Sequence, residues 1–226
     1  PRFTFAEGGA GQRSERVVWG NEPVSANYWN VFSARAQPGE SALVQMFGDD
    51  AYSASHYLGG DNAGQVSFVV GDFNHNPTGY VYSRTYRNAG SGAVTHQWEG
   101  GVDQLGFSGG SEWIGNFTWT SGDVAKMWDL YLGAGTTARI EVSDLSGTMD
   151  FGLEAFSSYG YSIFWAGRES GLYRDVHGVG GPESILFTAG AADWYGVLVW
   201  NNFASGGNYR IRIVDAGTSD APETGP

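Results

Sequence analysis

The sequence contains no cysteine and only one lysine, Lys126. The absence of cysteine excludes a disulfide scaffold, a cysteine nucleophile and a thiolate metal site. Basic residues are scarce as a class, because 12 of them stand against 24 acidic residues and give a formal net charge of −12. No nucleic-acid partner is expected, since binding to phosphates requires a basic surface. We interpret the acidity as a source of solubility.

Long apolar runs are also missing from the chain. None of its segments reaches the 18 or so consecutive apolar residues of a membrane-spanning helix, so no membrane span is expected. The chain begins at Pro1 instead of Met, which we interpret as the removal of a signal peptide or prosegment. The start at Pro1 predicts export to an extracellular or cell-surface location.

Helix-forming runs are few, whereas aromatic residues and glycine are abundant. The chain has nine Trp, 12 Tyr and 13 Phe, which favour strands, and 36 Gly, which mark turns. This composition predicts an all-β protein. The length of 226 residues suits either one large β-sandwich or two smaller ones in tandem.

The clearest strand pattern lies near the end of the chain. Residues 194–200 are mostly aromatic or β-branched, and residues 208–214 alternate polar with apolar side chains, as a half-buried strand does. The Asn, Ser and Gly residues between the two segments favour a reversal of direction. We predict a β-hairpin whose first strand is central in its sheet. Residues 80–98 show a similar layout of two strands and a turn.

Two similarities indicate an internal repeat. The layout of residues 80–98 recurs at an offset of 115, and residues 28–32 resemble residues 127–131 at an offset of 99. Two landmarks in the same order predict a tandem duplication. The predicted organisation is an N-terminal strand or arm at 1–13, a first β-sandwich at 14–105, a glycine-rich linker at 106–111, a second β-sandwich at 112–216 and an extended tail at 217–226.

The same patterns predict individual strands and the core. Residues 123–132 also fit helical spacing, but their likeness to residues 28–32 favours a strand. Strands are expected at 16–19, 27–34, 41–47, 65–70, 79–86, 93–98, 113–118, 127–132, 137–142, 150–156, 161–164 and 184–188, before the final hairpin. The side chains expected in the core are Trp29, Phe32, Trp128, Tyr131, Tyr209, Ile211 and Ile213.

Four segments of the second half follow a familiar order. They are 128–136 (WDLYLGAGT), 140–142 (IEV), 149–154 (MDFGLE) and 208–213 (NYRIRI). This order of aromatic strand, glycine turn, apolar strand, Asp-led strand and last hairpin resembles the bacterial pre-peptidase C-terminal domain. The first half is similar in outline, with QPGE at residues 37–40. The resemblance implies two tandem jelly-roll-like β-sandwich domains with an extracellular accessory or adhesive role and no chemistry of their own.

Sequence patterns for catalysis are weak. Gly106 to Gly110 fit the nucleophile-elbow pattern G-x-S-x-G, but no helix is expected to follow, so we interpret the segment as a linker. The four histidines, His56, His75, His96 and His177, lack the spacing of a zinc site. We therefore predict that the protein is not an enzyme.

Two groups of residues are candidates for ligand binding. Tryptophans that the core does not use could stack on sugar rings, and the carbohydrate-binding candidates are Trp98, Trp165 and Trp194. Carboxylate clusters offer the oxygen ligands that calcium prefers, with turn formation as their alternative role. The calcium candidates are Asp49, Asp50, Asp61, Asp144 and Asp150. No other cofactor is expected.

The two ends of the chain suggest self-association. Phe3 and Phe5 share one face of a short strand, which either opens the first domain or pairs with a neighbouring subunit. Residues 217–226, with Pro222, Glu223 and Pro226, have the composition of a disordered linker. We hypothesise head-to-tail contacts that form an open homopolymer. The predicted function is a secreted structural or adhesive subunit of a filament, sheath or surface layer; the alternative is a carbohydrate-binding module of a secreted enzyme.

Overall fold

The computed structural model confirms the all-β fold. The structure describes residues 2–6, 13–19, 29–37, 39–47, 58–59, 66–72, 80–89, 93–100, 103–156, 163–166 and 172–218. Besides strands, these residues include a short 3-10 helix, η2 (Ala216–Thr218). No helix among them is long and apolar enough to cross a membrane.

The predicted strands are present to within a few residues, and the short strands at 58–59, 104–105 and 173–174 were not predicted. The first part of the chain forms β1 (Arg2–Ala6), β2 (Arg13–Trp19), β3 (Trp29–Arg35), β4 (Ser41–Phe47), β5 (Leu58–Gly59), β6 (Val66–Asp72), β7 (Tyr80–Ala89) and β8 (Ala93–Gly100). The second part forms β9 (Gln104–Leu105), β10 (Glu112–Trp119), β11 (Ala125–Leu132), β12 (Thr137–Asp144), β13 (Phe151–Phe156), β14 (Ile163–Ala166), β15 (Tyr173–Arg174), β16 (Glu183–Thr188), β17 (Asp193–Asn201) and β18 (Gly207–Asp215). The segment with helical spacing is a strand, β11.

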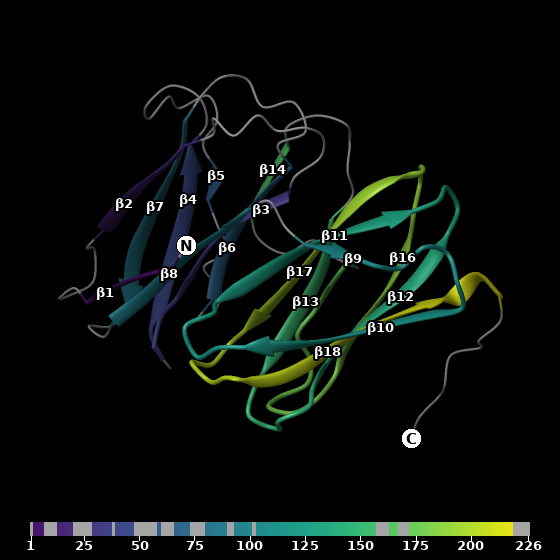
Figure 1. The fold of residues 1–226 in the computed structure, drawn as a ribbon. Helices are drawn as coiled ribbons and strands as arrows, with labels where there is room; N and C mark the ends of the chain where they lie inside the picture. Colours follow the sequence, from purple (N-terminus) through teal and green to yellow (C-terminus); the bar gives the residue numbers. More distant parts are fainter. Residues whose placement is uncertain are drawn as a thin grey trace.

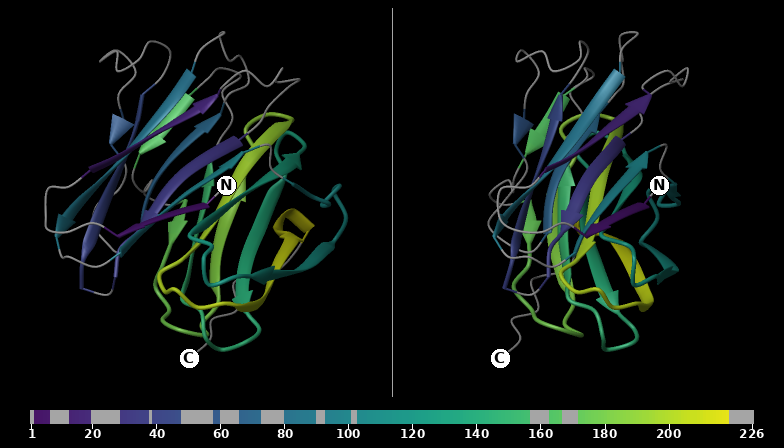
Figure 2. Two further views of the ribbon diagram at one scale, coloured as in Figure 1. Left: turned by 60° about the vertical axis from the view of Figure 1, so that its left-hand side comes forward. Right: turned by 90° about the vertical axis from the view of Figure 1, so that its left-hand side faces the viewer.

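The strands form four sheets that stack face to face (Figures 1 and 2). We number them in stacking order: sheet 1 is β2-β7-β4-β5, sheet 2 is β1-β8-β3-β6-β14, sheet 3 is β15-β13-β17-β11-β9 and sheet 4 is β10-β18-β12-β16. Strand β4 of sheet 1 packs on β3 and β6, strand β11 of sheet 3 packs on β3 and β8, and β13 packs on β12 and β16 of sheet 4. Sheets 2 and 3 therefore each have a neighbouring sheet on both faces.

Two sets of eight strands share one order. In sheets 1 and 2, the first strand pairs with the eighth, the eighth with the third and the third with the sixth, while the second, seventh, fourth and fifth form the other sheet. Counting β10, β11, β12, β13, β15, β16, β17 and β18 as first to eighth gives the same pairings in sheets 4 and 3. This is the strand order of an eight-stranded jelly roll. Strands β9 and β14 are additions at sheet edges.

The predicted hairpin is wrong in its pairing. Strand β17 pairs with β11 and β13 in sheet 3, whereas β18 pairs with β10 and β12 in sheet 4. The turn between them carries the chain across the core from one sheet to the other. Strands β7 and β8, at residues 80–98, are divided between sheets 1 and 2 in the same way. Two strands and a tight turn give the same local pattern in both arrangements.

Two further expectations need correction. Trp29 and Trp128 are not equivalent in strand order, because β3 is the third strand of its set and β11 is the second of the other. Tyr131 is 46% exposed, although Phe32, Trp128, Tyr209, Ile211 and Ile213 are buried as predicted. The position of Tyr131 on β11 lies on the face toward sheet 2, but beyond the part that sheet 2 covers. The side chain of Trp29 lies outside the described part of the chain.

The sheets enclose separate cores. The core between sheets 3 and 4 contains an aromatic cluster in which Phe117, Trp119 and Phe151 surround Tyr209, with ring centroids 5.3 to 5.6 Å from the tyrosine ring. A second core lies between sheets 2 and 3, where Val31, Val66, Phe68 and Val70 meet Val124, Ala125, Met127, Phe156, Leu198 and Trp200. Strand β17 contributes to both cores, which explains its nearly continuous apolar sequence and confirms that it is central.

Two segments connect the halves of the chain. Strand β14 lies between β13 and β15 in sequence, yet it pairs with β6 of sheet 2, and Figure 1 shows it beside the strands of the first half. The predicted linker at 106–111 follows β9, and its Phe107 is buried in the core between sheets 3 and 4. This segment is therefore packed and not a free hinge. The division into two tandem domains stays a prediction.

Candidate functional site at the junction of the inner sheets

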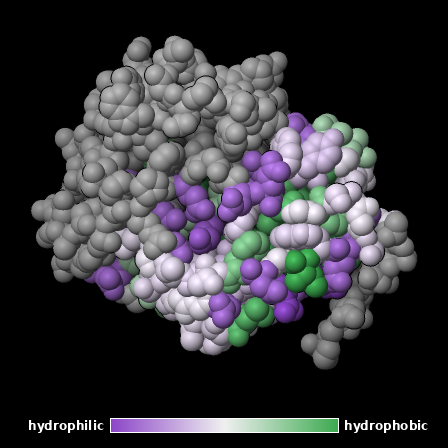
Figure 3. Space-filling model, in the orientation of Figure 1, coloured by the Kyte–Doolittle hydropathy of each residue, from purple (hydrophilic) through white to green (hydrophobic). Residues whose placement is uncertain are grey.

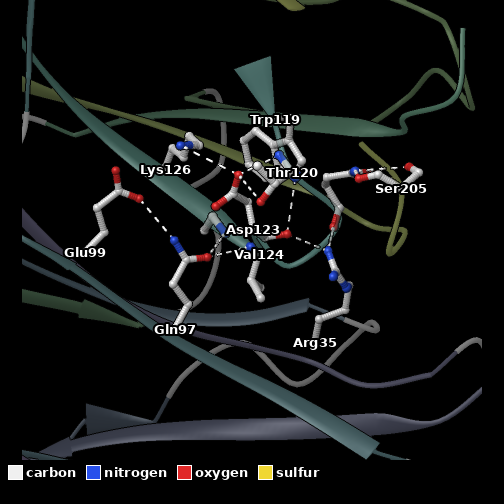
Figure 4. A network of polar contacts seen from close by, with 11 residues as sticks. Arg35, Gln97, Glu99, Trp119, Thr120, Asp123, Val124, Lys126 and Ser205 are labelled. Atoms are coloured by element: carbon white, nitrogen blue, oxygen red, sulfur yellow. Dashed lines mark hydrogen bonds and ion pairs between the residues drawn. The ribbon is translucent and has the colours of Figure 1, made fainter. Parts of the chain in front are cut away.

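A cluster of polar side chains lies where sheet 2 meets the turn between β10 and β11 (Figure 4). We call it the junction cluster. It is placed at the border of the second core, so each of its groups must satisfy its hydrogen-bonding needs within the protein. Its members are Arg35 at the end of β3, Gln97 and Glu99 on β8, Thr120 and Asp123 in the turn, and Lys126 on β11.

Arg35 joins the two halves through backbone carbonyls. Arg35 is 4% exposed, and its Nη1 donates to the carbonyl oxygens of Asp123 at 2.7 Å and Phe203 at 2.9 Å. Nη2 donates to the carbonyl oxygen of Ser121 at 2.8 Å. Burial lowers the pKa of Arg35 to about 10, an effect that the carboxylate of Asp123 opposes. Arg35 is therefore charged at neutral pH, and its hydrogen bonds are charge-assisted.

Gln97 makes a second link between the halves. Its Oε1 accepts from the backbone nitrogens of Val124 at 2.5 Å and Ala125 at 3.2 Å. Its Nε2 donates to Glu99 Oε2 at 3.3 Å. Together, Arg35 and Gln97 bind the backbone of the turn that leads into β11 from two sides. Since hydrogen bonds are directional, these contacts fix the position of sheet 3 on sheet 2.

Asp123 organises the turn itself. Its buried carboxylate accepts through Oδ2 from Thr120 N at 2.7 Å and from Thr120 Oγ1 at 3.1 Å. Lys126 Nζ lies 3.8 Å from the same oxygen and 5.8 Å from the centroid of the Trp119 ring. The Trp119 indole donates to the carbonyl oxygen of Asp123 at 3.2 Å. The carbonyl that receives Arg35 is thus held in place by its own turn.

Glu99 is the member of the cluster that titrates near neutrality. Burial raises its pKa from 4.5 to about 7; nearby Lys126 opposes this shift, and the carboxylates of Asp123 and Asp103 add to it. Glu99 can therefore gain or lose its proton in the physiological pH range. Within the described ranges, no group of three His, Asp or Glu side chains is arranged to hold a metal ion.

Two of the calcium candidates, Asp144 and Asp150, lie among the described residues. Asp144 accepts from the backbone nitrogens of Ser146 and Met149, both at 2.7 Å, which is the alternative role of turn formation. Asp150 has Asp175 as its neighbour, because the Asn202 side chain donates to both carboxylates at 3.2 Å. The other calcium candidates, Asp49, Asp50 and Asp61, lie outside the described residues.

The structure describes only one carbohydrate candidate with its side chain. Trp194 is half-buried on β17 and packs edge-to-face against the exposed Tyr131, with centroids 5.4 Å apart. Trp98 lies on β8 and Trp165 on β14, opposite Val70, but their side chains are outside the described part.

The structure describes some of the assembly candidates and not others. Phe3 and Phe5 lie on β1, which pairs with β8 of the chain's own sheet 2, opposite His96 and Val94. The strand expected at 1–13 is therefore an edge strand of this sheet. Pro222, Glu223 and Pro226 fall outside the described residues, and their role stays a prediction.

Sequence reasoning missed the junction cluster. Arg35 lies two positions from Ser33 and four from Val31, so it continues an alternation that faces the second core. The sequence signal that could have indicated this cluster was a charged residue at the end of an otherwise buried strand face. Its partners, however, are 86 to 168 residues away in sequence, and no local pattern identifies them.

No family model matches the chain, and no curated protein matches its sequence. A surface-associated copper-binding protein of Methylomicrobium album BG8, CorA, is 11% identical with a TM-score of 0.39, over 50% of this chain and 98% of that chain. The periplasmic inhibitor of g-type lysozyme PliG from Aeromonas hydrophila is 14% identical with a TM-score of 0.33, over 50% and 95%. The CBM22 tandem of Xyn10C from Paenibacillus barcinonensis is 9% identical with a TM-score of 0.28, over 95% and 97%. At these TM-scores the likeness carries no argument about function.

Proposed function

We propose that the chain is a non-catalytic, extracellular structural subunit of a filament, sheath or surface layer, in which the four stacked sheets act as one stiff body. The observation that carries this proposal is the contact of Arg35 with the carbonyls of Ser121, Asp123 and Phe203. If the halves separated or slid, a buried guanidinium and three carbonyls would lose their partners together, which is costly. A joint of this kind favours transmission of force over hinge motion.

Two other features support a stiff body. The second core buries apolar side chains of sheets 2 and 3 against each other, with Phe68 and Trp200 at 5.3 Å between ring centroids. Strand β14 pairs with β6, so the chain crosses between the halves more than once. On the face seen in Figure 3, hydrophobic and hydrophilic residues of the described part are mixed, as on a solvent-exposed surface.

The non-catalytic part of the proposal is supported by the hydrogen bonds of the polar side chains and by the position of Ser108. Arg35, Gln97 and Asp123 are committed to hydrogen bonds with backbone groups. Ser108, the serine of the G-x-S-x-G segment, is exposed on a loop that leads into strand β10 and not into a helix. The strand-to-helix turn that a nucleophile elbow requires is therefore absent at this serine.

Assembly of the purified chain tests this function. We expect sedimentation velocity over a rising concentration series to show growing species, and negative-stain electron microscopy to show ordered polymers or layers. Arg35→Met, which keeps the volume but removes the donors, should raise the radius of gyration in small-angle X-ray scattering and weaken assembly. Arg174→Met changes an exposed arginine on β15 and is the matched control. A wild-type chain that stays monomeric throughout the series would refute the proposal.

One observation favours carbohydrate binding as a second candidate function. The exposed Tyr131 and the half-buried Trp194 form an aromatic pair on the part of sheet 3 that sheet 2 leaves uncovered. The exposed Gln104 on β9 lies in register beside Asp129, which is two residues before Tyr131 on β11. Exposed aromatic rings next to amide groups suit an uncharged sugar, which has apolar ring faces and polar edges.

Affinity electrophoresis in gels that contain soluble xylan or hydroxyethyl cellulose tests this alternative. Retardation of the wild-type chain that Tyr131→Ala and Trp194→Ala both abolish would support it. Val176→Ala, at an exposed apolar residue of the loop before β16, is the control. Equal migration of all variants with and without polysaccharide would contradict it.

A further inference from the structure

The outer face of sheet 4 is the surface of interest. Along β18, Tyr209, Ile211 and Ile213 are buried in the core, so the intervening residues lie on the outer face. Neighbouring strands continue this face in register. Its members are Glu112, Ile114, Asn116 and Thr118 on β10, Arg210, Arg212 and Val214 on β18, Arg139, Glu141 and Ser143 on β12, and Ser184 and Leu186 on β16.

This face concentrates arginine in an acidic protein. Three of the 12 basic residues of the chain, Arg139, Arg210 and Arg212, lie on it. Arg212 Nε forms an ion pair with Glu112 Oε1 at 2.5 Å, although both side chains are 41% exposed. In register, Glu141 lies beside Arg212 on the other side. The face therefore carries both signs of charge in neighbouring positions.

Aliphatic side chains are exposed among these charges. Leu186 is 56% exposed and lies in register beside Arg139, and Ile114 is 46% exposed and lies beside Arg212. Arginine, which is enriched in protein interfaces, thus lies next to exposed aliphatic groups on this face. Lys126, the one lysine, lies on the opposite side of the sandwich, facing the junction cluster.

We propose that the outer face of sheet 4 packs against the same face of a second copy of the chain, sheet on sheet about a two-fold axis. This inference rests on the proposed structural function, for which it supplies one contact between subunits. A two-fold contact brings each patch onto itself, so a face that carries both signs can place arginines of one copy against glutamates of the other. A polyanion would instead meet the glutamates and the net charge of −12.

The size of the face meets the requirement of a specific contact. Four strands about 4.8 Å apart and roughly eight residues long cover roughly 500 Å². Two such faces bury about 1,000 Å² in total, which is near the lower limit for a specific interface. The chain already contains a contact of the same type, because sheets 2 and 3 pack face to face around apolar side chains and Arg35.

Charge reversal tests the contact in the full-length chain. Arg139→Glu and Leu186→Glu should each weaken self-association at least tenfold by sedimentation velocity, with circular dichroism confirming that the variants fold. Arg174→Glu and Val176→Glu introduce the same changes at exposed residues outside the face and should leave association unchanged. Glu141→Arg should also weaken association, whereas an equimolar mixture of Arg139→Glu and Glu141→Arg chains should associate again.

The outcomes separate this inference from the proposed function. Assembly of the wild-type chain that the variants of sheet 4 do not weaken would overturn the inference and leave the structural function intact. A wild-type chain that is monomeric at every concentration would overturn both. Loss of association in the single variants, with recovery in the mixture, would establish the two-fold contact.

Discussion

Protonation of Glu99 should control the stability of the junction. Its pKa of about 7 in the folded chain lies above the ordinary value of 4.5, so the folded state binds more protons than the unfolded state between these two pH values. The free energy of unfolding therefore falls as pH rises through this window, and the loss is complete above pH 7. A shift of this size corresponds to about 3 kcal/mol, which partial exposure of the side chain reduces to about 2 kcal/mol.

The replacement Glu99→Gln removes the titration and keeps an acceptor for Gln97 Nε2. We expect wild type and variant to have similar unfolding free energies near pH 5 and the variant to be more stable by about 2 kcal/mol at pH 8. Urea unfolding at four pH values, followed by tryptophan fluorescence, measures both profiles. Asp193→Asn, at a carboxylate of β17 outside both the junction cluster and sheet 4, is the control. Parallel profiles for wild type and Glu99→Gln would refute the reasoning.

Three other substitutions test packing. Arg35→Met should lower the free energy of unfolding by about 3–5 kcal/mol, because the carbonyls of Ser121, Asp123 and Phe203 lose their charged donor; urea unfolding measures this loss. Gly152→Ala should cost about 2–3 kcal/mol and change the near-ultraviolet circular dichroism, because the new Cβ would overlap the Trp200 indole, whereas Gly110→Ala meets open space and should have little effect. Ile211→Ala should cost about 2–5 kcal/mol by removing a buried side chain between sheets 3 and 4, and a loss below about half a kcal/mol would contradict its place in the core.

The longer strands could be predicted because each carries its own sequence pattern, whereas the two-residue strands β5, β9 and β15 are too short to show one. Alternation at 208–213 follows from one face in the core and one in water, and β18 shows this pattern of burial. The pairing could not be predicted, because β17 and β18 look like a hairpin whether they lie in one sheet or in two. Strand β17 is apolar along its length because it packs against sheet 2 on one face and against sheet 4 on the other.

The junction cluster was beyond sequence reasoning for a related reason. Arg35 is one charged residue at the end of a strand, and such residues are usually exposed. Its burial depends on turns that are brought together by two sets of strands. Trp194 was identified as a candidate, but its partner Tyr131 was assigned to the core, since a strand that is covered along only part of its length looks uniformly buried in sequence.

The combination of an apolar core with a polar border explains how sheets 2 and 3 keep one relative position. Apolar contacts such as those of Met127 and Leu198 with sheet 2 are non-directional, so they stabilise contact between the sheets without selecting one register. The bonds of Arg35 and Gln97 to backbone groups are directional, and a shift of a few ångströms would break all of them. The border therefore selects the register that the core stabilises. Glu99 accepts from Gln97 at this border, so the desolvation cost of its ionisation falls there, and a rise in pH should lower the stability of the border.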